Sequence, residues 1–162
     1  MLRGVRAVAP GYAGGDVPNP TYYQVVSGTT GHAEVIRFEY DPQVIFYRDL
    51  LDVFFATHDP TTINRQGADV GPQYRSVIFY ASPEQKIEAE QRIRELNTSD
   101  EQGAPIVTRV ESLTHFWPAE DYHEKYYENH KEQGYCQIVI NPKLQIVKER
   151  FARLLEQSTG QS

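Results

Sequence analysis

Hydrophobic and polar residues alternate between residues 34 and 40, which is the spacing of a β-strand with one buried face. One face of this strand would carry Glu34, Ile36, Phe38 and Tyr40. Short apolar runs predict further strands at residues 74–80, 106–111 and near 137–140. The carboxylate of Glu34 is therefore expected at the rim of the buried face, beside a glycine-rich segment.

Helical spacing of apolar residues predicts a helix over residues 46–57. Its apolar stripe consists of Tyr47, Leu50, Leu51, Phe54 and Phe55. A second helix is expected from Ser82 to about Leu96, because Ser82 can cap it and Gln85 can complete a capping box. Pro118 is expected to open a third helix, and residues 142–155 are expected to form the last one.

Two segments between these elements are rich in turn-forming residues and are predicted to be long loops, at residues 10–33 and 58–71. Long loops inside compact domains often carry function. Mixed strands and helices favour an α+β fold, a two-layer sandwich. We expect a single domain over residues 1–157 and a short flexible tail at 158–162.

The charge balance narrows the classes of function. Twenty-two acidic residues against 16 basic ones give a net charge of −6, which disfavours nucleic-acid binding. No apolar run of about 18 residues predicts a membrane span, and no segment is typical of a signal peptide. The only cysteine, Cys136, cannot form an internal disulfide, which favours a reducing, cytoplasmic location.

Glu34 is the first candidate for chemistry. Partial burial would disfavour its charged form and raise its pKa, and a carboxylic acid kept neutral can donate a proton. The alternative is a strand-end glutamate that bends out to water. The two loops add polar side chains, and those singled out are Tyr22, Tyr23, Asp69, Gln73, Tyr74 and Arg75. Tyrosine hydroxyls, an aspartate and a protonated glutamate would suit an uncharged oxygen acceptor, unless the tyrosines only pack at the core edge.

A metal site is not expected. His123 and His130 would lie roughly 10 Å apart on one helix face, too far to share an ion. No Cys/His cluster, phosphate-binding loop or nucleophile elbow is present in the sequence. Cys136 is either a small buried hydrophobe or a reactive thiol.

Several strings occur in a specific order: GYAGG, PNPTY, SGTTGHAEVIRFEYDP, HDPTTINRQGADVGPQYRSVIFY, PIVTRVE, and FWPAEDYHEKYYENH followed by GYC. Together, from about Leu2 to Cys136, they strongly resemble the A-class peptide methionine sulfoxide reductases. The resemblance implies a ferredoxin-like, split βαβ sandwich whose mixed sheet carries helices on one side.

The resemblance also implies an activity, the reduction of the S epimer of methionine sulfoxide to methionine in repair of oxidative damage. A cysteine thiolate attacks the sulfoxide sulfur in this family. Glu34 would protonate the oxygen, Tyr22 and Tyr74 would assist it, and Asp69 would hold a water or hydrogen-bond network. Cys136 would resolve the sulfenic acid or relay the disulfide.

The partners implied are methionine sulfoxide, free or in proteins, and thioredoxin or another thiol as electron donor. No metal or organic cofactor, nucleic acid or membrane is implied, and a monomer is expected. If Tyr22, Glu34, Asp69 and Tyr74 were scattered in the structure, this transfer of roles would fail.

The sequence departs from the family in one respect, because the string that holds its nucleophile, Gly-Cys-Phe-Trp, is absent. We expect this string upstream of Met1, together with the first strand of the family fold, so that the chain is N-terminally truncated. Two alternatives remain open. The chain is a non-catalytic module that binds methionine sulfoxide, or Cys136 serves as the nucleophile.

Overall fold

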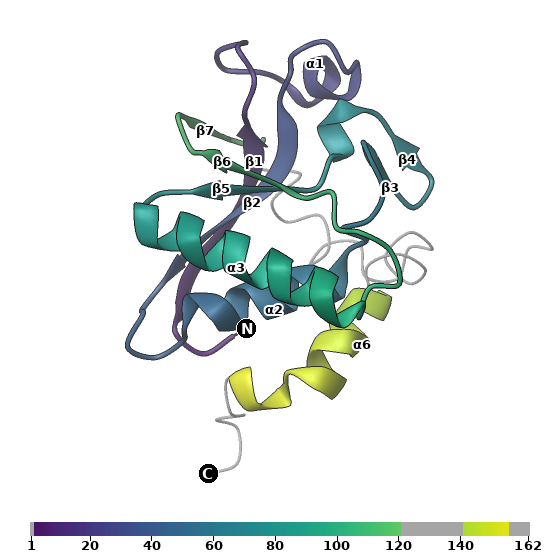
Figure 1. Cartoon of the computed structure of the whole chain (residues 1–162). Coiled ribbons are helices and arrows are strands. Elements are labelled where there is room, and N and C mark those ends of the chain that lie inside the picture. Colours follow the sequence, from purple (N-terminus) through teal and green to yellow (C-terminus); the bar gives the residue numbers. More distant parts are fainter. Residues whose placement is uncertain (1, 121–140, 156–162) are drawn as a thin grey trace.

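The computed structural model describes residues 2–120 and 141–155 and has an α+β fold (Figure 1). Its main sheet is antiparallel, in the order β2-β1-β7. The central strand β1 (Val5–Ala13) pairs with β2 (Ala33–Tyr40) along its length and with the short β7 (Phe116–Pro118) at its end. The strand predicted over residues 34–40 is therefore confirmed.

Two smaller strand pairs accompany this sheet. Strands β5 (Val77–Tyr80) and β6 (Arg109–Ser112) run parallel to each other. Strands β3 (Arg65–Gln66) and β4 (Asp69–Val70) form a short antiparallel hairpin inside the segment predicted to be a loop. Parallel and antiparallel pairs thus occur together, as expected for a mixed α+β fold.

The described helices are α1 (Tyr22–Val26), α2 (Tyr47–Thr57), α3 (Pro83–Ser99) and α6 (Asn141–Arg150), with 3-10 turns at Pro72–Tyr74 and Ala152–Leu154. Ser82 caps α3, because its hydroxyl accepts a hydrogen bond from the N–H of Gln85 at 3.3 Å. The Gln85 side chain accepts from the N–H of Ala81 at 2.7 Å, one residue before the partner that a capping box predicts.

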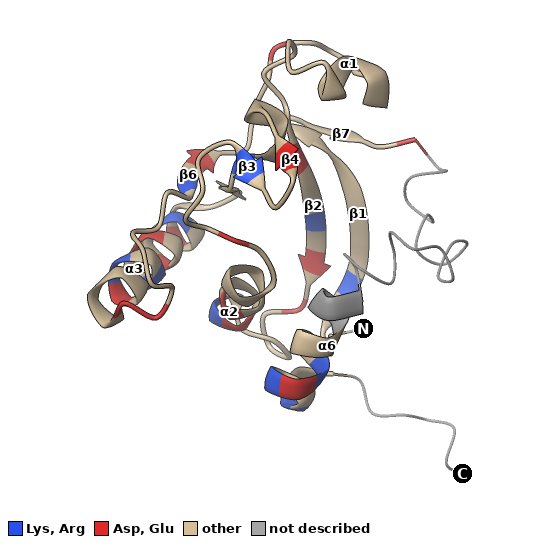
Figure 2. Cartoon of the chain, turned by 90° about the vertical axis from the view of Figure 1, so that its right-hand side faces the viewer, with Lys and Arg blue, Asp and Glu red and all other residues tan. Residues whose placement is uncertain are grey.

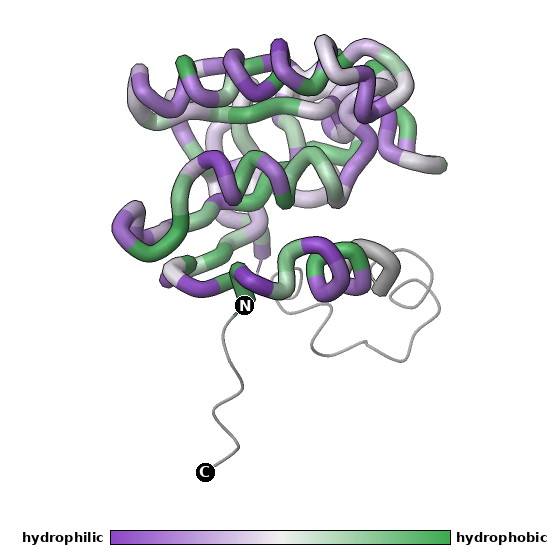
Figure 3. Tube along the Cα trace, turned by 60° about the horizontal axis from the view of Figure 1, so that its bottom comes forward, coloured by the Kyte–Doolittle hydropathy of each residue, from purple (hydrophilic) through white to green (hydrophobic). Residues whose placement is uncertain are grey.

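The apolar core consists of separate clusters. The first lies between α2, α3 and β5, and contains Leu51, Phe55, Ile78, Ala89 and Leu96. The second lies between β1, α2 and the C-terminal helix, and contains Val5, Ile45, Phe151 and Leu154. Hydrophobic residues recur between hydrophilic ones along the helices (Figure 3), as the predicted stripe of α2 requires.

Several local predictions were wrong, and helix α1 lies within the first segment predicted to be a loop. Strand β1 was predicted partly as loop because Pro10 and Gly11 interrupt its apolar pattern. A Cβ on Gly11 would lie 2.3 Å from the Phe116 ring, so the close approach of β7 requires glycine there. Pro118 ends a strand rather than opening a helix. Tyr74 lies in a 3-10 turn rather than in a strand. The strand predicted near 137–140 and the tail at 158–162 lie outside the described residues.

Strands β2 and β5 each have an edge without a partner in the part of the chain that the structure describes. Strand β2 pairs only with β1, and β5 pairs only with β6. On β2, the side chains of Ile36 and Phe38 are 59% and 42% exposed. The strand face predicted to be buried, which also carries Glu34, is therefore largely exposed in the structure.

Hydrogen bonds tie both ends of β2 to the residues that flank β5. Arg75 Nη2 donates to the carbonyl of Gly31, before β2, at 3.0 Å. Gln85 Nε2 donates to the Tyr40 hydroxyl, at the end of β2, at 3.2 Å. Side-chain hydrogen bonds therefore link β2 to the segments on either side of β5, whereas the two strands belong to different sheets.

Replacing Ile36 by lysine is expected to change the free energy of unfolding by no more than about 0.5 kcal/mol, because the side chain is largely exposed. The same change is expected to reduce self-association, since a charge on a strand edge opposes pairing with another chain. Urea unfolding and sedimentation at several concentrations measure the two effects. Ile87→Lys is the matched control, because Ile87 is 60% exposed on α3. A large loss of stability for Ile36→Lys alone would contradict the prediction.

Candidate functional site

Glu34 is the second residue of β2, at the end of the sheet where all three strands meet. It lies opposite Tyr12 of β1, and Tyr12 in turn lies opposite Trp117 of β7. Tyr12 is buried and packs with Val25 of α1 and with Trp117. Glu34 therefore lies at an end of the sheet where Tyr12, its neighbour on β1, is held by close packing.

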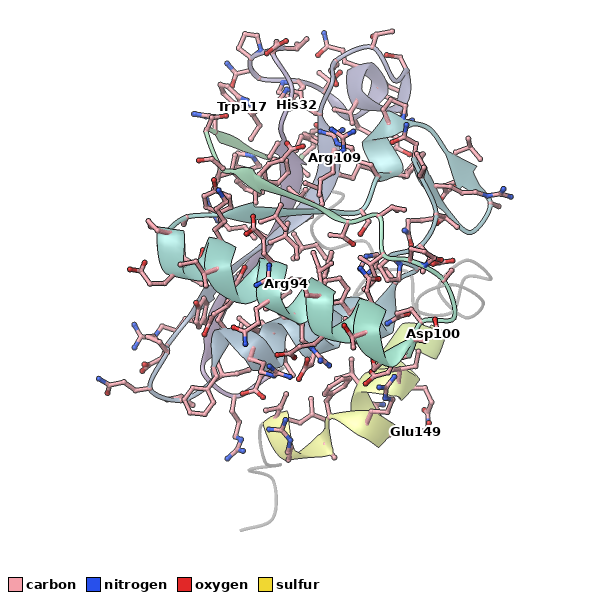
Figure 4. The ribbon with its side chains drawn as sticks, viewed as in Figure 1. His32, Arg94, Asp100, Arg109, Trp117 and Glu149 are labelled. Carbon is pink, nitrogen blue, oxygen red and sulfur yellow. The ribbon has the colours of Figure 1, made fainter. Side chains whose placement is uncertain are left out.

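His32 fixes the loop between β1 and β2 and lies at the same end of the sheet (Figure 4). Its ring is buried, with Nδ1 3.0 Å from the backbone N of Gly15 and Nε2 2.7 Å from the carbonyl oxygen of Val17. A backbone N–H can only donate and a carbonyl can only accept, so Nε2 carries the proton and Nδ1 accepts. The sequence patterns assigned His32 no role, although it lies two residues before Glu34.

Tyr22 is the first residue of α1, and two sets of contacts hold it there. Thr21 and Gln24 form a capping box around the start of the helix. The carboxylate of Glu120, just after β7, accepts the N–H of Tyr22 at 3.1 and 3.3 Å. The ring of Tyr23 packs edge-on against the Tyr22 ring at 5.7 Å. Glu120, which the sequence analysis did not single out, thus anchors α1 to the end of the sheet.

Replacing Glu120 by alanine is expected to lower the free energy of unfolding by about 0.5–2 kcal/mol, the usual effect of losing a side-chain acceptor at a helix N-terminus. Glu120→Gln keeps an acceptor oxygen and is expected to lose less. Urea unfolding of both variants provides the measurement. If alanine and glutamine were equally destabilising, the bond to the Tyr22 N–H would not be the cause.

Asp69 and Tyr74 reach the same region from the second predicted loop. Asp69 lies on β4, drawn in red beside the basic residue of β3 in Figure 2. The hairpin continues through Gly71, at φ 145°, into the turn that carries Tyr74. This conformation favours glycine and places the turn against the end of α1, where Gln73 bonds the carbonyl of Val26.

The pKa shifts indicate that four predicted residues lie close enough for their charges to interact. Burial raises the pKa of the Glu34 carboxyl, and the charge of Asp69 raises it further. Burial also raises the pKa of Tyr22 and of Tyr74, and Glu34 and then Asp69 add to both rises. The cluster of Tyr22, Glu34, Asp69 and Tyr74 is therefore assembled from three separate segments of the chain, one of which carries both Asp69 and Tyr74.

The cluster is more open than the sequence suggests. Both tyrosines are half-buried, whereas Glu34 and Asp69 keep exposed surface. A raised pKa increases the protonated fraction of Glu34 and keeps both phenols protonated, so all three groups can donate hydrogen bonds. The arrangement can hold and protonate an oxygen atom that approaches from solvent.

Within residues 2–120 and 141–155, no group of three or more histidine, cysteine or acidic side chains could hold a metal ion. In the same part of the chain, no helix has the length and apolarity needed to cross a membrane. Cys136, predicted to resolve the sulfenic acid, lies outside the described residues, as do His123 and His130.

Comparison with known proteins agrees with this site. The family model described as "Peptide methionine sulfoxide reductase" matches residues 1–155. The peptide methionine sulfoxide reductase MsrA of Ralstonia nicotianae is 54% identical over 160 residues, covering 96% of this chain and 84% of the relative. MsrA of Deinococcus radiodurans is also 54% identical, over 93% of this chain and 73% of the relative.

Solved structures agree as well. The reduced form of Mxr1 from Saccharomyces cerevisiae has a TM-score of 0.76 and 37% identity, over 82% of this chain and 76% of that protein. Mxr1 in complex with Trx2 has a TM-score of 0.51 and 27% identity, over 76% of this chain and 67% of that protein. The sequence, the fold and the assembled cluster lead to one conclusion: this chain belongs to the peptide methionine sulfoxide reductase family, a family of oxidoreductases.

Proposed function

We propose that this chain reduces the S epimer of methionine sulfoxide, free or in proteins, and so repairs oxidative damage. One observation carries the proposal, the assembly of Glu34, Asp69, Tyr22 and Tyr74 into one electrostatically coupled cluster. A sulfoxide oxygen is a hydrogen-bond acceptor without charge, and three protonated groups of the cluster can donate to it.

Each residue of the cluster has a role in the reaction. The phenols of Tyr22 and Tyr74 hold the sulfoxide oxygen, and the acid form of Glu34 transfers its proton to that oxygen. Asp69 supports the network and keeps the Glu34 proton in place by raising its pKa. A thiolate attacks the sulfur of the protonated sulfoxide and forms a sulfur–sulfur bond. The oxygen then passes to the cysteine sulfur as this bond and the sulfur–oxygen bond of the substrate break, so methionine leaves and the thiol becomes a sulfenic acid. A second thiol then forms a disulfide and releases water.

The mechanism requires a nucleophilic thiolate and, after it, a second thiol. Cys136 is the only cysteine in the sequence, and the Gly-Cys-Phe-Trp string of the family is absent. We propose that Cys136 resolves the sulfenic acid once it has formed on the nucleophilic thiol. If Cys136 is itself the nucleophile, an external thiol must resolve it.

We infer that thioredoxin or another thiol supplies the electrons, in a reducing cytoplasm and without a metal or organic cofactor. The structure of the related Mxr1 in complex with Trx2 supports this electron donor. A monomer is expected to suffice, because the four residues of the cluster come from one chain.

The test is reduction of the separate S and R epimers of a methionine sulfoxide peptide with dithiothreitol as electron donor, followed by mass spectrometry. Conversion of the S epimer alone is expected. With Cys136→Ser, loss of turnover even in dithiothreitol identifies Cys136 as the nucleophile. Turnover that persists in dithiothreitol but is lost with thioredoxin as electron donor identifies it as the resolving thiol, because dithiothreitol can resolve a sulfenic acid directly. Equal conversion of both epimers would contradict the proposal.

A second candidate is a module that binds methionine sulfoxide without reducing it, and the single cysteine of the sequence favours it. Calorimetric titration with a methionine sulfoxide peptide and with its reduced form separates the two candidates. Selective binding of the sulfoxide without turnover in dithiothreitol would support the binding module. Absence of binding would exclude both.

A further inference from the structure

Gln73 is a buried polar side chain to which the mechanism above assigns no role. It is 5% exposed and immediately precedes Tyr74 in the turn after β4. Its Nε2 donates to the carbonyl oxygen of Val26 at 3.1 Å. Val26 is the last residue of α1, and Tyr22 is the first. One amide therefore joins the two elements that carry the tyrosines of the cluster.

The partner of the amide decides its orientation. A carbonyl oxygen can only accept, so the NH2 group of Gln73 must face Val26. The amide oxygen is then left buried without a hydrogen-bond partner. An unpaired buried oxygen is destabilising, so stability alone does not explain why a glutamine occupies this position.

Two glycines leave room for the amide between α1 and the turn. A Cβ on Gly71 would lie 2.3 Å from Oε1 of Gln73, so the amide would have to move away from its present place. A Cβ on Gly28, two residues after α1, would lie 3.5 Å from the same oxygen. The backbone on both sides thus accommodates a glutamine held in one place.

We propose that Gln73 is a positioning residue that sets the separation of the Tyr22 and Tyr74 phenols by bonding the end of α1 from within the turn that carries Tyr74. This inference rests on the proposed function, in which both phenols hold one sulfoxide oxygen. Gln73 also lowers the pKa of Tyr74, against the larger rise caused by burial, which agrees with an amide lying beside that phenol.

The test compares Gln73→Met with Gln102→Met. Methionine keeps the length of the side chain but cannot donate to Val26, and it also removes the unpaired oxygen, so stability is expected to change little. Gln102 is the matched control, because its Nε2 donates to the carbonyl of Phe55 at 3.2 Å, outside the tyrosine cluster. Thermal unfolding and titration with a methionine sulfoxide peptide are measured for both variants.

Gln73→Met is expected to bind the peptide roughly three- to tenfold more weakly, the range for loss of one hydrogen bond, while Gln102→Met binds as the parent protein does. The ligand-free proteins are also labelled with 13C-tyrosine, and the NMR signal of the Tyr22 ring is assigned with Tyr22→Phe. This signal is expected to shift in Gln73→Met and not in Gln102→Met. Unchanged affinity or an unchanged Tyr22 signal in Gln73→Met would overturn the proposal.

Two further outcomes remain decisive. If the parent protein fails to bind the sulfoxide, the proposed function is wrong, but the Tyr22 signal still tests the link through Gln73. If Gln73→Met does not fold, Gln73→Glu replaces it, because a protonated glutamate can donate to Val26 and a carboxylate cannot. Its affinity relative to the parent protein must then rise as the pH falls, and a constant ratio would overturn the proposal.

Discussion

Glu34→Gln is expected to lower the rate of methionine sulfoxide reduction by about 10²- to 10⁴-fold, the range for loss of a general acid. Glutamine can donate a hydrogen bond to the sulfoxide oxygen but cannot transfer a proton to it. The substrate therefore still binds, and the sulfur–oxygen bond does not break. Initial rates with dithiothreitol over a range of peptide concentrations should show a large fall in kcat and a small change in KM.

The control for this substitution is Glu39→Gln on the opposite face of the same strand, which removes an equal charge outside the cluster. It should leave both constants unchanged. A rate for Glu34→Gln within a few-fold of the parent protein would mean that another group, or solvent, donates the proton.

The pH dependence of the reduction rate also tests whether Glu34 is the proton donor. Glu34 acts in its protonated form, so activity should be present below its raised pKa and be lost as the pH rises through that value. Asp69 is the second cause of the rise, after burial, so Asp69→Asn should move this loss of activity to lower pH. Rates in overlapping buffers at constant ionic strength test this shift.

Gly15→Ala is expected to lower the free energy of unfolding by about 3 kcal/mol, at the upper end for a group forced into a packed site. A Cβ at this position would lie 2.3 Å from the carbonyl oxygen of Thr30 and 2.4 Å from the backbone N of His32. Both contacts are with backbone, so the two chain segments must separate. The bond from Gly15 to the His32 ring would be lost as well.

Urea unfolding with linear extrapolation provides the measurement for Gly15→Ala. Gly103→Asn is the control, because no atom lies near that position and asparagine tolerates its left-handed conformation. This control should lose at most about 1 kcal/mol. Equal stabilities of the two variants would show that the chain can open at Gly15 without a penalty.

Local signals in the sequence predicted the elements whose cause is local. The start of α3 follows from Ser82, Pro83 and Gln85, because a helix cap depends on neighbours within a few residues. Strand β1 could not be predicted in this way. Its residues are small and interrupted by Pro10 and Gly11, and two flanking strands stabilise it. The residue pattern of β1 itself does not indicate that these two strands will pair with it.

The candidate site divides along the same line. Family strings identified Tyr22, Glu34, Asp69 and Tyr74, whereas spacing along the chain could not show that the three segments carrying them come together. The contacts that hold these residues were not predicted. Gln73 was singled out only as a polar loop residue, and Glu120 and His32 were given no role. Glu120 and Gln73 bind backbone groups of α1, and His32 binds backbone groups of a loop. Any residue type offers the same backbone N–H and C=O, so the sequence of the partner carries no signal for such bonds.

Helix α2 has a consequence for how the protein unfolds. Leu51 and Phe55 belong to the core cluster shared with α3, while Leu50 and Val53 pack against the cluster shared with β1 and the C-terminal helix. If α2 separated from either core cluster, it would expose apolar surface of the other cluster as well. The backbone amides of α2 should therefore be among the slowest to exchange their hydrogen with solvent, because they become accessible only when both core clusters open together.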